Sequence, residues 1–351
     1  MTKIPHLSLC SSLLYLRAPQ RLVLAGRKLG RLWSFHHPVH GRIPVVSGLE
    51  LAEEVFAENL RFAGDARLQD WLGATNPFGH IPIDSRRVLL QYVERAIEGA
   101  DPRYHLDVAL RSAAQSSVDV GPALRAATLR WLVDAFCQSN QLHAQPALAA
   151  ALCWQRSART VPLLAPRLRR WSSIFQEVAP AKLRLLDALS ACASNKAIGG
   201  RYGSYIAGGI LTMFGPIADA LPMLAMSALA HRSPYNDIRI SHALSTAHPM
   251  PLLVLEARRY VELQKCGLML DPENLLGCTN GTHIATDLPG SCLPFGVGAL
   301  AGTLRAVVTR FLTAALGVAS KLDITAVEQP RTGRVRLCVG PTGLRMAKWP
   351  G

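Results

Sequence analysis

The middle of the chain, from about residue 85 to residue 230, has the hydrophobic periodicity of α-helices. Apolar positions recur every three or four residues, and the segment is rich in alanine, leucine and arginine. Proline and glycine interrupt the pattern at residues 99–102, 162–166 and 199–200. We therefore predict helices over Arg86–Glu98, Pro122–Gln138, Gln145–Ser157, Leu168–Ser194 and Tyr205–His231.

Both ends of the chain have a different residue pattern, with short runs of β-forming residues. Ile43–Ser47 reads as a strand, and the amphipathic stretch Leu49–Asn59 reads as a helix. After Pro249 we predict strands at Leu252–Leu255 and Arg334–Val339, and a last helix at Thr303–Leu316. The fold class expected is mainly α (α+β), with a helix-rich body and small mixed β-sheets near the N- and C-terminal parts.

One predicted helix is apolar enough to raise the question of a membrane. Tyr205 to Ala230 carries a single charged residue, Asp219, and is long enough to cross a bilayer. Pro216 and Pro222 lie within it, and no aromatic belt marks its far end. A membrane span and a helix buried in a globular core both fit this pattern, and we expect the buried helix.

Composition narrows the classes of protein. Hydrophobic residues make up 49% of the 351 residues, enough for a sizeable core, and the net charge is +14. The basic residues form scattered short groups rather than an arm, so we expect no nucleic acid as partner. The eight cysteines include no Cys-x-x-Cys pair and no zinc-type spacing with histidine. They read as free thiols of a reducing compartment, which predicts a cytoplasmic location.

The most specific motif is the stretch Leu293-Pro-Phe-Gly-Val-Gly-Ala299. It resembles the first half of the haem-binding loop of cytochromes P450, a haem-thiolate family, in which the pattern is Phe-Gly-x-Gly-x-(His/Arg)-x-Cys-x-Gly. Phe295, Gly296 and Gly298 match, whereas Gly302 stands at the position of the cysteine. In an alternative alignment Gly302 is the last glycine of the motif, and there too no cysteine precedes it. The resemblance implies that the thiolate that holds the iron is missing.

A second match lies in the apolar helix. Ala207-Gly-Gly-Ile-Leu-Thr212 resembles the helix that passes over the haem in this family, with Gly208 and Gly209 allowing the close approach. Thr212 matches the threonine of the oxygen groove, which can bond back to the helix backbone and bend it. Leu211 replaces the acidic residue that delivers protons. On its own, the glycine pair also fits a packing site in a buried helix.

Weaker matches follow in the order of the family. The segment 243–249 resembles the Glu-x-x-Arg helix, with Ala243 and Thr246 in place of the ion pair, and losing both partners can be nearly neutral. The segment 251–262 resembles the strand beside the haem, in which Arg258 or Arg259 would reach a propionate. The segment 336–349 resembles the closing hairpin, and the segment 84–87 resembles the start of a helix with a basic propionate contact.

The resemblance implies a single domain over residues 1–351, with a helical body at about 85–245 and a mixed β and haem-loop region at about 249–351. It implies haem as cofactor, a ferredoxin-type electron donor, and monooxygenation of hydrophobic small molecules. Because the axial position is Gly302, we expect this activity to be lost. Three alternatives stay open: a non-catalytic helper of another enzyme, a haem enzyme ligated instead by Cys292 or His283, and a membrane-associated helical protein.

Overall fold

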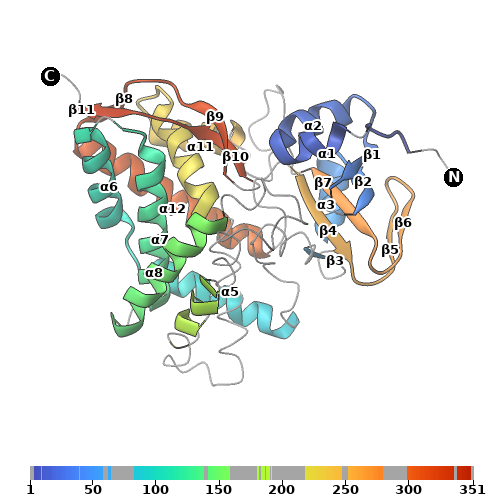
Figure 1. Cartoon of the computed structure of the whole chain (residues 1–351), viewed down its shortest axis with the longest axis horizontal. Helices are drawn as coiled ribbons and strands as arrows, with labels where there is room; N and C mark the ends of the chain where they lie inside the picture. The colour runs from blue at the N-terminus through green and yellow to red at the C-terminus, as the bar shows by residue number, and fades with distance from the viewer. Residues whose placement is uncertain are drawn as a thin grey trace.

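The computed structural model describes two structural parts, one built on a sheet and one built of helices (Figure 1). The residues it describes are 4–8, 10–38, 40–57, 62–64, 83–116, 118–137, 141–158, 180–181, 183–185, 187–189, 191, 218–246, 252–279, 299–335 and 338–348. Within them lie three separate clusters of buried apolar side chains, one in the helical part and one on each face of the sheet.

Strands from distant parts of the chain form the main sheet. Its five strands run in the order β1-β2-β7-β4-β3, with β2 and β7 parallel and the other pairs antiparallel. The strands are β1 (Leu32–His37), β2 (Gly41–Val46), β3 (Phe62–Gly64), β4 (Leu252–Ala257) and β7 (Leu275–Thr279). The chain therefore leaves this sheet after residue 64 and returns to it at residue 252 to complete it.

Each face of the sheet is covered by a different set of elements. The helices α1 (Cys10–Arg17) and α2 (Pro19–Arg27) cover one face. The helix α3 (Leu49–Ala57) and the hairpin of β5 (Val261–Leu263) and β6 (Leu268–Leu270) cover the other. Alternation along a strand sends successive side chains to opposite faces, so Val45 joins the first cluster and Val46 the second.

Helix α2 lies unusually close to β1. A Cβ added at Gly26 would overlap the indole ring of Trp33, which has no exposed surface. The indole N–H donates a hydrogen bond of 2.7 Å to Oγ of Ser47, so the buried polar atom is satisfied. The glycine is needed here for the close approach of helix and ring rather than for its backbone freedom.

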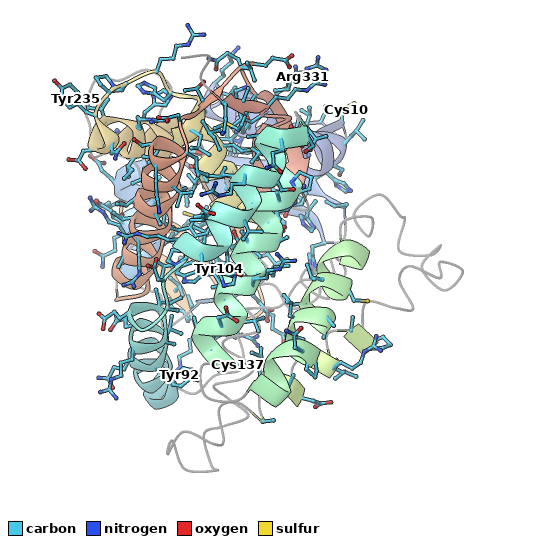
Figure 2. The ribbon with its side chains drawn as sticks, turned by 90° about the vertical axis from the view of Figure 1, so that its left-hand side faces the viewer. Cys10, Tyr92, Tyr104, Cys137, Tyr235 and Arg331 are labelled. Carbon is cyan, nitrogen blue, oxygen red and sulfur yellow. The ribbon has the colours of Figure 1, made fainter. Side chains whose placement is uncertain are left out.

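Helices make up most of the second part, and the described residues from 180 to 191 are helical and contribute to its core as well. The other described helical segments are α5 (Ile83–Glu98), α6 (Arg103–Ser116), α7 (Val120–Cys137), α8 (Gln141–Ala158), residues 218–230, α11 (Asn236–Thr246) and α12 (Ala299–Lys321). Trp131 of α7 and Phe311 of α12 meet at 5.4 Å between ring centroids in the middle of this core. At one end of the core, Tyr92 stacks on Phe136, the residue before Cys137. Tyr92 and Cys137 are labelled in Figure 2.

Short strands close the helical part at the C-terminal end. Strand β8 (Ile324–Ala326) pairs with β11 (Met346–Lys348), which packs on α6. Strands β9 (Arg331–Val335) and β10 (Cys338–Thr342) form an antiparallel hairpin. The single strand predicted at Arg334–Val339 is therefore wrong, since the chain reverses within that range. Apolar residues recur through the whole range, so the sequence pattern did not indicate a turn between the two strands.

Most other predicted elements are confirmed where the structure describes them. Helices α5, α7 and α8 match predicted ranges to within a few residues, and the last helix is longer than Thr303–Leu316 at both ends. Of the predicted apolar helix, residues 218–230 are helical and buried in the core, and residues 205–217 lie outside the described part. Among the described residues no helix is both long and apolar enough to cross a bilayer. The fold is helix-rich α+β with small mixed sheets.

Candidate functional site

Gly302 lies in the first turn of helix α12, as the fourth residue of a helix that starts at Ala299. The helix packs against α5, α6 and α11. Helix α12 starts directly after the Phe-Gly-x-Gly stretch and contains Gly302, the position that the resemblance matches to the ligating cysteine. Glycine offers no side-chain donor, so this position cannot bind a metal.

Most of the other residues predicted from the resemblance lie outside the described residues. These are Phe295, Gly296, Gly298 and Cys292 around the loop, His283 before it, and Gly208, Gly209 and Thr212 in the apolar helix. Their roles stay predictions.

Arg258 is the predicted propionate contact that the structure does describe. It lies in the bend after β4, with its side chain 42% exposed, and its guanidinium is 3.5 Å from the carboxylate of Glu256. Arg259 beside it is also exposed. Two adjacent arginines, Arg258 and Arg259, thus follow the end of strand β4. Arg258 already has an acidic neighbour, Glu256, on that strand.

Ala243 is the position that the resemblance matches to the glutamate of the Glu-x-x-Arg helix. It lies on α11 with no exposed surface, inside the helical core. A glutamate at this position would have to be buried, and a buried carboxylate needs a partner to offset its desolvation. Alanine removes that requirement, which explains how the helix remains packed without the ion pair.

Arg239 ties the same helix to residues 218–230. Its guanidinium donates hydrogen bonds of 2.9 and 3.0 Å to the carbonyl oxygens of Ala228 and Leu229. These are carbonyls of the last turn of the preceding helix, where a cation is favoured by the helix dipole. Burial lowers the pKa of Arg239.

The rings of His231 and His242 lie 4.1 Å apart between centroids at the same helix junction. The pKa of His242 is lowered, first by burial and then by His231. The sequence did not reveal this pair, since His231 follows the helical residues 218–230 and His242 lies on α11, and only the packing of α11 brings them together.

Two of the described cysteines are poor candidates for an iron ligand. Burial raises the pKa of the Cys278 thiol to about 12, and burial also raises the pKa of Cys266. Both are therefore thiols near neutral pH, whereas a metal ligand must be a thiolate. Within the described part of the chain, no group of three or more histidine, cysteine or acidic side chains is placed to hold a metal ion.

A separate cavity of about 390 Å³ lies between the α5–α6 turn and α12. Arg103 and Arg310 line it together with Asp101, and Arg310 is held by a 3.1 Å bond to the carbonyl oxygen of Glu98. The Asp101 carboxylate accepts the backbone N–H of Arg103 at 3.0 Å, so the start of α6 is already capped. The cavity is open to solvent and carries charged side chains in its lining, unlike the enclosed apolar pockets that usually bind small hydrophobic molecules.

A histidine cluster lies in the sheet part, against α1. His37 is fully buried, with its ring 4.9 Å from that of Tyr15 and 5.1 Å from that of His40. The backbone N–H of His40 donates to Nδ1 of His37 at 3.3 Å, so in the neutral ring the proton is on Nε2. Burial, followed by the neighbouring His40 and His36, lowers the pKa of His37 to about 3.

Comparison with known proteins adds no assignment, since the chain matches no protein-family model and no curated protein at a significant level.

Proposed function

We propose that this protein is a degenerate homologue of the cytochromes P450 that does not carry out haem-thiolate oxygenation. The observation that carries the proposal is the place of Gly302 in the first turn of α12, directly after Phe295-Gly-x-Gly298. The family's chemistry depends on a cysteine thiolate that donates electron density to the iron and favours O–O cleavage. Without that thiolate the fold has no means to activate oxygen in this way.

The order of elements supports the proposed relationship. Helix α11 stands where the Glu-x-x-Arg helix was expected, and strand β4 follows it as the expected strand does. The helix α12 follows the glycine-rich stretch, and the β9–β10 hairpin follows near the C-terminus. This order of described elements is compatible with the order that the resemblance implies.

The substitutions near the site are compatible with a stable fold. Ala243 is fully buried and leaves no isolated charge. Removing one partner of a buried ion pair costs about 3–5 kcal/mol, whereas removing both can be nearly neutral. A protein released from catalysis can therefore lose the pair and remain folded.

We further propose that the protein acts in the cytoplasm. The five cysteines that the structure describes in detail are all free, as expected in a reducing compartment. With oxygenase chemistry absent, the retained fold would act through binding, as a helper of another enzyme.

An absorption spectrum tests the proposal. The purified chain, expressed with a haem precursor, is reduced and treated with carbon monoxide, and no thiolate-type band is expected. Gly302→Cys places a thiol at the axial position and should gain the band if the missing cysteine is the cause, whereas the matched Gly302→Ser should not. A thiolate-type band in the unmodified protein would overturn the proposal.

A further inference from the structure

The first 49 residues contain no acidic side chain. The first one in the sequence is Glu50, and before it come seven basic residues: Lys3, Arg17, Arg21, Arg27, Lys28, Arg31 and Arg42. Half of the net charge of +14 is therefore concentrated in about one seventh of the chain. Such a concentration creates a positive potential that attracts anionic surfaces.

Helix α2 presents part of this charge on one face. Arg21, Leu24 and Lys28 are exposed at spacings of three and four residues, which places them on one side of the helix. Leu22, between them in sequence, is buried on the opposite side against the sheet. The outward face of α2 is thus a leucine between two cations.

Exposed leucines recur along α1 and α2. Leu13 of α1 is 53% exposed, Leu24 is 39% exposed, and Leu29, just after α2, is 40% exposed. Helices α1 and α2 pack against each other and against the same sheet (Figure 1), and Cys10 at the start of α1 is exposed as well (Figure 2). We use the name α1–α2 face for the exposed residues Leu13, Arg21, Leu24, Lys28 and Leu29, which lie on these two packed helices or directly after them.

We propose that the α1–α2 face docks on the surface of an anionic phospholipid bilayer. Arginine and lysine would bind lipid phosphates, and the three leucines would enter the boundary between headgroups and acyl chains. This combination favours lipid over a polyanion such as nucleic acid, because a polyanion uses the cations and leaves the leucines in water. The proposal concerns attachment to one leaflet, not a span, and does not depend on the proposed loss of catalysis.

Vesicle co-sedimentation with the full chain tests the proposal. The protein should bind vesicles of phosphatidylcholine mixed with an equal part of phosphatidylglycerol, and should not bind phosphatidylcholine alone. Binding should weaken as salt is added, because salt screens charges near the surface. No binding to the mixed vesicles at low salt would overturn the proposal.

Charge variants identify the face. Arg21→Gln with Lys28→Gln should weaken binding about 30-fold, since each basic residue near an anionic surface contributes about 1 kcal/mol. The matched control, Arg130→Gln with Arg184→Gln, removes two exposed charges from helices of the other part and should leave binding within about twofold. Equal loss in both variants would show a response to net charge alone and would contradict the assigned face.

Leucine variants separate lipid from other anionic partners. Leu13→Ser, Leu24→Ser and Leu29→Ser together should weaken vesicle binding about tenfold or more, because apolar area no longer leaves water. The control Leu183→Ser changes a leucine that is 58% exposed elsewhere and should have no effect. If the charge variant loses binding and the leucine variant does not, the protein is held by charge alone, the leucines do not enter the bilayer, and the proposal fails.

Discussion

His37 makes the sheet part sensitive to acid. Its ring is buried beside Tyr15 and His40, and its pKa is about 3 in the folded protein against 6.5 for the free side chain. When the pH falls below about 6.5, the unfolded chain takes up a proton at this position and the folded chain does not. The stability from the neutral ring is therefore complete above the unfolded pKa and is lost as the pH falls toward about 3.

The magnitude follows from the two pKa values of His37. In the window between them, each pH unit costs about 1.4 kcal/mol of unfolding free energy. From about pH 7 to about pH 5 the protein should lose about 2 kcal/mol through this residue alone. The folded ring stays unprotonated at pH 5, because that pH lies well above its folded pKa.

His37→Phe removes the titration and keeps a ring in the aromatic cluster with Tyr15 and Phe35. At neutral pH the variant should lose about 1 kcal/mol, because the His40 backbone N–H no longer has the Nδ1 acceptor. Urea unfolding of both proteins at about pH 7 and about pH 5 gives the four free energies. The stability lost between the two pH values should be about 2 kcal/mol smaller in the variant than in the parent protein.

His36→Phe is the matched control, because His36 is the neighbouring residue on β1 and is only half-buried. It should keep the acid sensitivity of the parent protein. If His37→Phe loses as much stability on acidification as the parent does, the buried neutral ring is not the source of the sensitivity and the reasoning is refuted.

Three substitutions test the packing described above. Gly26→Ala should lower the unfolding free energy by about 1–3 kcal/mol because its Cβ would overlap Trp33, and unchanged stability in thermal or urea unfolding would contradict that contact. Gly317→Ala, at a helical position with nothing within 4 Å, should instead raise it by about 0.5–1 kcal/mol, and a loss would mean that the position is crowded. Arg239→Ala should lower the unfolding free energy by about 2 kcal/mol, since it removes two hydrogen bonds to carbonyl oxygens in the last turn of residues 218–230. A change within about 0.5 kcal/mol in urea unfolding would refute this role.

Periodicity alone predicted much of the helical part. Helix α7 was predicted because its apolar positions repeat at helical spacing, and the breaks at proline and glycine set its limits. Helix α6 was missed, although Leu106, Ala109, Leu110 and Ala113 mark one buried face at that same spacing. The signal was present and would have been found by counting matches along residues 103–116.

The assembly of the sheet was not predictable from local pattern. Val45 pairs with Gly277, which is more than two hundred residues away in the sequence. Neither strand has a sequence feature that identifies the other as its partner. The close pairing does require a glycine at position 277, because a Cβ there would lie 2.8 Å from a methyl group of Val45. A glycine inside a strand can signal such an approach, but only the fold shows what approaches.

The candidate site was predicted only in its most local feature. A last helix was predicted at Thr303–Leu316, and α12 covers that range and extends it at both ends. The environment of Ala243 and the bonds of Arg239 depend on how α11 packs in the core, which the sequence of α11 does not specify. The identity of Gly302 was plain from the start, and it is also the feature that decides the proposed chemistry.

The most direct test of the central claim is the absorption spectrum of the reduced protein with carbon monoxide, recorded on folded chain expressed with a haem precursor. The absence of a side chain at Gly302 predicts no thiolate-type band. A thiolate-type band would show that a cysteine reaches an iron in this protein and would contradict the claim that its haem-thiolate chemistry is lost.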